Sequence, residues 1–171
     1  MEIKEIIGDY STFFADIFDR LQKLGIDISG YPLSHLGIKI ASFEEYEHLR
    51  DEIKKYSVAF AENEHNGRPI GVMRLRTPLE LPNGFSVDIL ELMPPKPGSN
   101  YPTGLEHLGV VVGKQLGEFG TTHQSVITGR QDQSPICKPF FIAFDNGKRV
   151  KFYDIALKDV IEQEGKVFIS V

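Results

Sequence analysis

Residues 34–40 read Ser-His-Leu-Gly-Ile-Lys-Ile, and residues 106–112 repeat the pattern as Glu-His-Leu-Gly-Val-Val-Val. Successive side chains of a strand point to opposite faces, so each run predicts a strand with one apolar face. The opposite face carries a histidine, His35 in the first run and His107 in the second. Two related strands that each offer a histidine indicate a duplicated module with a site shared between its halves. This pattern points to metal chemistry.

The composition is typical of one compact domain. The chain has 171 residues, of which 41% are hydrophobic, so we expect residues 1–171 to form a single domain with a core. The 24 acidic residues outnumber the 19 basic ones, which argues against nucleic acid as a partner. The single cysteine, Cys137, excludes an internal disulfide and favours the reducing cytoplasm. Neither a signal peptide nor a membrane span is recognisable, so no membrane partner is expected.

The chain divides into an N-terminal extension and two halves. Apolar residues at helical spacing from about residue 2 to residue 24 predict an amphipathic helix within an extension of residues 1–30. Its apolar stripe suits either the core or a contact within a homodimer. Residues 31–95 form the first half and residues 104–171 the second, with a linker rich in proline and glycine between them.

Each half predicts the order strand, helix and three strands. Ser42, with Glu45 three residues later, is typical of a capping box that begins a helix. Asn66 and Gly67 form the strongest hairpin signal of the chain. The further elements that we expect are strands over 57–62, 69–76 and 85–93, a weak helix or loop over 117–139, strands over 140–144 and 149–153, a helix over 157–164 and a strand over 167–171.

This organisation resembles the vicinal-oxygen-chelate superfamily, the fold of glyoxalases and extradiol dioxygenases. Three features carry the resemblance: the strand starts at His35 and His107, the strand end Ile-Leu-Glu-Leu over 89–92, and the hairpin Asp-Asn-Gly over 145–147. The resemblance implies an α+β fold in which two βαβββ modules form a curved mixed sheet around a cleft that contains a metal. The N-terminal helical extension, and a C-terminal helix and strand, are added to this framework.

The sequence is more closely similar to the YecM-like branch of that superfamily. The most specific match is Asn-Gly-Arg-Pro-Ile over residues 66–70. Further matches are Asp-Ile at 27–28, Glu-Asn at 62–63, Phe-Ser-Val at 85–87, Glu-Leu at 91–92, Glu-His at 106–107 and Lys-Phe at 151–152. The branch is generally described as metal-binding, with no settled reaction. The resemblance therefore implies a fold and a site, but no substrate.

By position, the resemblance places the metal ligands of the superfamily at His35, Glu91, His107 and Lys151. Lys151 is a departure, because an acid is usual there and a protonated lysine has no lone pair for a metal. The two histidines and one carboxylate that remain resemble the facial triad of iron(II) oxygenases, and they also suit a hydrolytic zinc. We therefore expect a divalent metal ion as cofactor, and Zn, Fe(II), Mn and Ni all stay open.

Cations on the strands of the site predict an anionic substrate. Lys39 shares the strand face of His35, Arg68 follows the predicted hairpin turn, and Arg74 lies on the return strand. We assign these three residues to substrate binding, although each could also be an ordinary surface charge. Lys151 is assigned to catalysis, since a cation beside the metal stabilises developing negative charge.

The sequence thus predicts a metal-dependent enzyme that acts on a small oxygenated, anionic molecule. Isomerase, lyase and dioxygenase reactions all fit a metal that binds two neighbouring substrate oxygens. The alternative is a protein that sequesters a small molecule without chemistry, like some members of the superfamily. The departure at Lys151 is the feature that favours this alternative.

Overall fold

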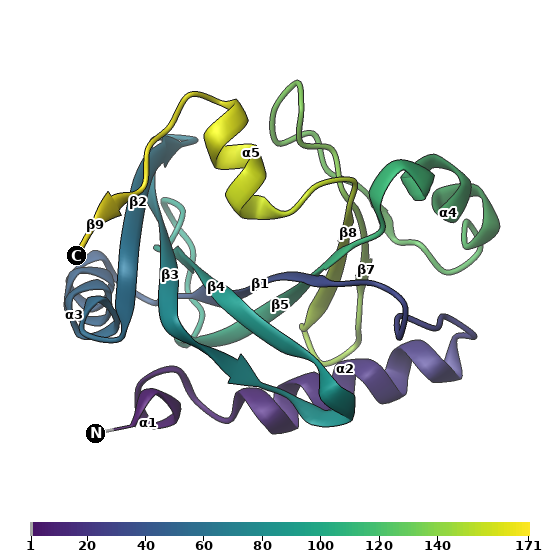
Figure 1. Ribbon diagram of the computed structural model, residues 1–171, viewed down its shortest axis with the longest axis horizontal. Helices are drawn as coiled ribbons and strands as arrows, with labels where there is room; N and C mark the ends of the chain where they lie inside the picture. The colour runs from purple at the N-terminus through teal and green to yellow at the C-terminus, as the bar shows by residue number, and fades with distance from the viewer. Residues whose placement is uncertain (1) are drawn as a thin grey trace.

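One curved sheet runs through the computed structural model, which describes residues 2–171 (Figure 1). The strands in this part of the chain are β1 (Leu33–Lys39), β2 (Ser57–His65), β3 (Arg68–Glu80), β4 (Ser86–Met93), β5 (Gly104–Val111), β6 (Gly129–Arg130), β7 (Phe140–Ala143), β8 (Arg149–Tyr153) and β9 (Ile169–Ser170). The helices are α1 (Ile3–Ile7), α2 (Tyr10–Lys23), α3 (Phe43–Lys54), α4 (Leu116–Thr122) and α5 (Leu157–Gln163), with 3₁₀ turns at Pro82–Gly84 and Gly113–Gln115.

The strand order shows that the two halves repeat one another. The first half runs β1-α3-β2-β3-β4 and the second runs β5-α4-β6-β7-β8. In the sheet, the order β6-β7-β8-β5-β1-β4-β3-β2-β9 places the halves back to back, with β9 added at one edge. The pairs β1–β4 and β5–β8 are parallel and the others are antiparallel, so the sheet is mixed. These findings confirm the predicted α+β fold of two βαβββ modules.

The two faces of the sheet have different coverings. On one face, Leu36 of β1 and Leu108 of β5 are fully buried and belong to a core that includes Phe14 and Ile17 of α2. Figure 1 shows α2 crossing one side of the sheet and α5 lying on the other. Burying a large apolar side chain contributes about 1.5–3 kcal/mol, so this α2 face anchors the sheet. The opposite face carries the histidines.

The N-terminal extension contains two helices, and the prediction of one continuous helix was wrong. Gly8 lies between α1 and α2 with a φ of 93°, a conformation that favours glycine. Asp9 then begins α2, because its side chain accepts a hydrogen bond from the Thr12 backbone N–H at 3.1 Å. An apolar stripe reports which side chains are buried, but it does not report whether the backbone between them is continuous.

Two local sequence signals have their predicted structures. Ser42 accepts a hydrogen bond from the backbone N–H of Glu45 at the start of α3. Asn66 and Gly67, with φ of 52° and 74°, form the tight turn between β2 and β3. Strand β3 continues to Glu80, beyond the predicted end, and its pairing with β4 resumes at Leu79 after a register shift that follows Arg74. Among residues 2–171, no helix is long and apolar enough to cross a bilayer.

Candidate metal centre

His35 and His107 meet where the two halves join. Both side chains are fully buried, and their Nε2 atoms lie 2.9 Å apart. The β1–β5 ladder places His35 opposite Gly109 and His107 opposite Gly37. Each histidine therefore lies over the glycine that follows the other histidine by two residues.

The two glycines provide the space in which the imidazole rings lie. A Cβ atom at Gly37 would be 2.1 Å from Cε1 of His107, and a Cβ at Gly109 would be 2.7 Å from Cε1 of His35. Neither glycine has a positive φ, so it is the space and not the backbone that requires glycine here. The signal was present in the sequence as the repeated His-Leu-Gly, but strand alternation alone does not reveal it.

Glu91 of β4 is the third member of the group. Its Oε2 atom lies 3.2 Å from Nε2 of His107 and 3.7 Å from Nε2 of His35. The group His35, Glu91 and His107 could hold a metal ion, because one donor atom of each residue lies within 4.8 Å of the others. Two donors come from the first half and one from the second.

The donor distances fit a divalent ion. With metal–ligand bonds of about 2.1 Å, neighbouring donors are roughly 3 Å apart at right angles and roughly 3.4 Å apart in a tetrahedron. The three observed separations, 2.9, 3.2 and 3.7 Å, span these values. Two imidazole nitrogens and one carboxylate oxygen form a donor set suited to zinc or iron(II).

The residue before each histidine contacts its other ring nitrogen. Ser34 Oγ lies 2.8 Å from Nδ1 of His35. The same Oγ also accepts a hydrogen bond from the backbone N–H of Leu157 at the start of α5. Oε2 of Glu106 lies 2.5 Å from Nδ1 of His107. A carboxylate only accepts hydrogen bonds, so Nδ1 of His107 donates to Glu106, and Nε2 is the nitrogen that faces Glu91 and could bind a metal.

Two β-bulges make these contacts. The β1–β5 register shifts at Ser34 in one strand and at Glu106 in the other. Each bulge inserts one unpaired residue and changes the direction of its side chain. As a result, Ser34 and Glu106 contact the rings of the histidines that follow them. Strict alternation along each strand does not predict these contacts of Ser34 and Glu106, because it takes no account of the extra residue in a bulge. Their position directly before each repeated histidine was the only available signal.

The electrostatic environment suits metal binding. Burial lowers the pKa of His35 to about 3 despite the opposing charge of Glu91, so its imidazole is neutral at pH 7. Burial opposes ionisation of Glu91, but the hydrogen bond with His107 and the nearby charges hold its pKa well below the usual range. For Glu106, burial is likewise outweighed by the contact with His107, and the pKa falls to about 2. A neutral imidazole and ionised carboxylates are the forms that a metal requires.

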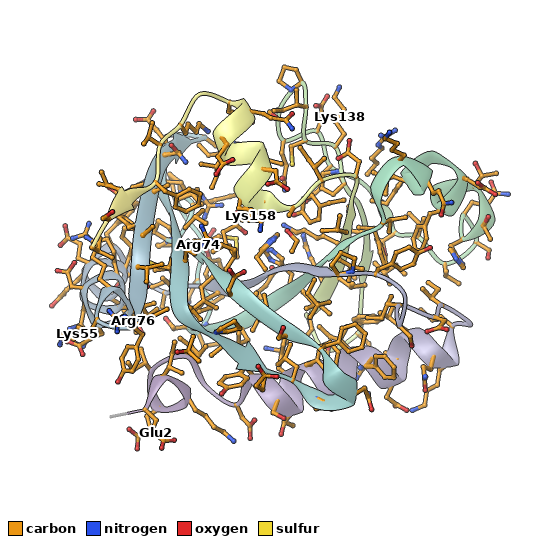
Figure 2. All side chains as sticks on the ribbon, viewed as in Figure 1. Glu2, Lys55, Arg74, Arg76, Lys138 and Lys158 are labelled. Carbon is orange, nitrogen blue, oxygen red and sulfur yellow. The ribbon has the colours of Figure 1, made fainter. Side chains whose placement is uncertain are left out.

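A cavity of about 550 Å³ borders this group at Glu91, and its lining also includes Lys151, whereas the two histidines are buried behind it. Helix α5 and the segment 131–137 also contribute to its lining. Figure 2 labels Lys138 beside that segment and Lys158 on α5, and both lie on the same side of the sheet. The cavity therefore lies between the sheet face with the histidines and these two covering segments.

Of the four cations predicted for the site, three line the cavity and one lies outside it. Lys39, Arg68 and Lys151 line the cavity, whereas Arg74 does not. The side chain of Arg74, labelled on β3 in Figure 2, is 52% exposed and lies 3.7 Å from Asp88. The pairing Gly109–Lys151 between β5 and β8 repeats the pairing Gly37–Glu91 between β1 and β4.

Lys151 is 6% exposed, and its charge helps to lower the pKa of Glu91. Within residues 2–171, however, no ion pair joins the two side chains. Lys151 therefore faces the cavity with its ammonium group free of a direct carboxylate partner in this part of the chain. This leaves the cation available to a ligand.

The comparisons with known proteins agree with this fold. Residues 2–164 match the sequence family described as YecM protein. The chain belongs to the YecM family. This match confirms the resemblance to the YecM-like branch, and the paired βαβββ modules are the architecture expected of the vicinal-oxygen-chelate fold.

Two curated relatives match part of the chain. An uncharacterized protein of Haemophilus influenzae is 31% identical over 61% of this chain and 54% of its own length. Protein YecM of Escherichia coli is 27% identical over 65% of this chain and 58% of its own length. The chain thus spans just over half the length of these relatives.

Solved structures extend the comparison to nearly the whole fold. The structure described as Structural Genomics, Protein EC4020 aligns with a TM-score of 0.75 and 20% identity over 91% of this chain and 89% of its own. Methylmalonyl-CoA epimerase from Mycobacterium tuberculosis aligns with a TM-score of 0.49 and 19% identity, over 75% of this chain and 91% of its own.

Proposed function

We propose that this member of the YecM family binds one divalent metal ion through His35, Glu91 and His107 and acts as an enzyme on a small oxygenated anion. The observation that carries the proposal is the convergence of these three donors, from both halves of the chain, with Glu91 at the wall of the cavity. A buried group of this composition is otherwise costly, because a carboxylate and two imidazoles lose their hydration there.

The protein's own groups would divide the work. Ser34 and Glu106 orient the two imidazoles from behind, as outer hydrogen-bond partners do in metal sites. A bound metal would act as a Lewis acid on two neighbouring substrate oxygens. Lys151 lies on the same cavity wall, where its ammonium group attracts an anionic substrate and stabilises negative charge that develops on it.

A second function is favoured by one observation. Lys151 occupies the position where the superfamily has an acid, and a site with three donors and a cation also suits a protein that holds an anion without converting it. Both functions need the same metal and the same cavity. Turnover of the bound anion is therefore the property that distinguishes them.

The metal is tested by analysing protein purified without an affinity tag, followed by titration with Zn²⁺ and Mn²⁺ in a calorimeter. We expect about one ion per chain, and a loss of binding in His107→Gln. Equal binding by wild type and His107→Gln would overturn the proposal.

Turnover is tested on the metal-loaded protein with a panel of small 2-hydroxy and 2-oxo acids in D₂O, followed by proton NMR. Metal-dependent exchange or conversion of one acid, reduced in Lys151→Met, supports an enzyme. Binding of an acid without exchange or conversion supports the sequestering protein.

A further inference from the structure

Arg68 is a buried cation that has no anionic partner among residues 2–171. Its residue is 8% exposed at the start of β3. Nη1 donates to the carbonyl oxygen of Pro94, whereas Nε is buried without any hydrogen-bond partner in the described chain. None of the ion pairs within residues 2–171 includes Arg68. A guanidinium remains charged at every working pH, so its burial without a counter-ion is costly.

Two of the other cations that line the cavity have carboxylate partners. Arg149 lies 3.4 Å from Glu106, and Lys166 lies 2.7 Å from Glu164. Their charges are offset within the protein. The charge of Arg68 is not, although Arg68 lines the same cavity.

The free donors of Arg68 have the arrangement that recognises oxyanions. With Nη1 directed to Pro94, Nε and Nη2 remain as a planar pair of donors. Such a pair binds a carboxylate or a phosphate through two parallel hydrogen bonds, which gives geometry as well as affinity. A lysine at this position would supply the charge but not the planar pair of donors.

The strand register separates Arg68 from the metal group. Val72 of β3 pairs with Glu91 of β4, and Arg68 precedes Val72 by four residues on the same face. At about 3.3 Å per residue, these two β3 positions are roughly 13 Å apart along the strand. Ile70, which lies between these two positions on the same face, lines the cavity, as do Val72 itself and Leu157 of α5. The cavity lining therefore includes apolar surface on the strand face that joins Arg68 to the metal group.

We propose that Arg68 forms a second anion subsite, so that the cavity takes a linear dianion. One end of this ligand would carry the vicinal oxygens that bind at the metal group, and the other a carboxylate or phosphate that binds Arg68, with a short aliphatic segment between. The metal end rests on the proposed function, whereas the Arg68 end does not.

The Arg68 subsite is tested on protein kept metal-free with a chelator. Inorganic phosphate and acetate are titrated while the arginine Nε–H signals are followed by ¹H–¹⁵N NMR. We expect the Arg68 signal, assigned by its loss in Arg68→Lys, to shift saturably. Arg68→Met should weaken phosphate binding at least tenfold, as expected for charge-assisted hydrogen bonds.

Arg74→Met is the matched control, because Arg74 lies on the same strand but outside the cavity. It should leave phosphate binding unchanged within about twofold, since its exposed cation is screened. An unmoved Arg68 signal, or equal weakening by Arg68→Met and Arg74→Met, would overturn the subsite. If Arg68→Met fails to fold, phosphate binding is compared in Arg68→Lys instead, because this variant retains the charge but lacks the planar pair of donors.

The dianion is tested with Zn²⁺-loaded protein and the straight-chain dicarboxylates from malonate to suberate, each compared with the monocarboxylate of equal length. We expect one chain length to bind at least tenfold more tightly than its monocarboxylate, and Arg68→Met to remove this difference. Phosphate binding at Arg68 without any such gain would overturn the dianion. Failure of the metal site would leave the phosphate titration intact, so the two failures are distinguishable.

Discussion

The two halves of the chain use one framework for opposite charges. In the first half, β1 supplies His35 and the neighbouring β4 supplies Glu91; in the second, β5 supplies His107 and β8 supplies Lys151. The histidines, the glycines two residues later and the strand registers correspond in both halves. The backbone framework thus determines where these side chains come together, whereas single residues determine what the site can bind.

The largest expected effect is the difference in Zn²⁺ affinity between variants at Glu91 and at Lys151. Glu91→Ala removes one of three donors and should weaken Zn²⁺ affinity by more than about 100-fold, since loss of outer-shell partners alone costs 10–100-fold. Lys151→Met removes no donor and should change affinity by less than about threefold. Calorimetric titration of both variants measures the contrast.

A third variant sharpens this comparison. Lys151→Glu makes the second half resemble the first and offers a fourth donor, so Zn²⁺ should bind more tightly than in wild type. The assignment of unequal roles would fail if Glu91→Ala and Lys151→Met weakened binding equally.

The next effect concerns the space beneath each imidazole. Gly37→Ala should destabilise the protein by about 3 kcal/mol and Gly109→Ala by about 1 kcal/mol, because the first places its Cβ closer to the facing ring. Denaturant unfolding measures both. Gly104→Ala on β5 is the control and should have little effect, since a Cβ atom there would have open space for 4 Å around it. Equal stability of all three variants would refute the account of the glycines.

A smaller effect is expected from the residues that precede the histidines. Glu106→Gln should weaken Zn²⁺ binding about tenfold, since the amide is a weaker partner for Nδ1 of His107 than the carboxylate. Ser34→Ala should weaken it less, because a neutral hydroxyl polarises His35 less. A larger loss in Ser34→Ala than in Glu106→Gln would reverse this order.

A last prediction, which involves no substitution, concerns Cys137 in the segment 131–137 that lines the cavity. Burial, with the charge of Glu91 next, raises the pKa of this thiol to about 12. At pH 8 the thiol stays protonated, so alkylation by iodoacetamide should be at least ~100-fold slower in the folded than in the unfolded protein. Equal rates would show that the segment 131–137 does not stay closed over the cavity.

The sequence predicted the parts of the fold that depend on local chemistry. The repeated strands, the Ser42 cap and the Asn66-Gly67 turn follow from periodicity and backbone preference, which act within a few residues. The group His35, Glu91 and His107 followed from the repeat together with the family resemblance. For the segment 117–139 the sequence predicted only a weak helix or loop; the structure has the short helix α4 there, and also the two-residue strand β6, which depends on tertiary pairing with β7.

The contacts that the sequence did not predict depend on register. The bulges at Ser34 and Glu106 interrupt strict alternation by one residue, and nothing in either strand marks them in advance. The partnerless Nε of Arg68 could not be predicted either, because it is known only once the surrounding acids are placed.

The pairing of Leu36 with Leu108 at the middle of β1 and β5 has a consequence for how such a chain can arise. Two separate copies of one half, joined about this point, would form a dimer with a two-fold axis through the site. In such an assembly every residue occurs twice, so the site would hold two acids or two lysines. When the two copies are encoded separately, as the two halves of this chain are, one can keep Glu91 while the other carries Lys151, so the shared centre can become asymmetric.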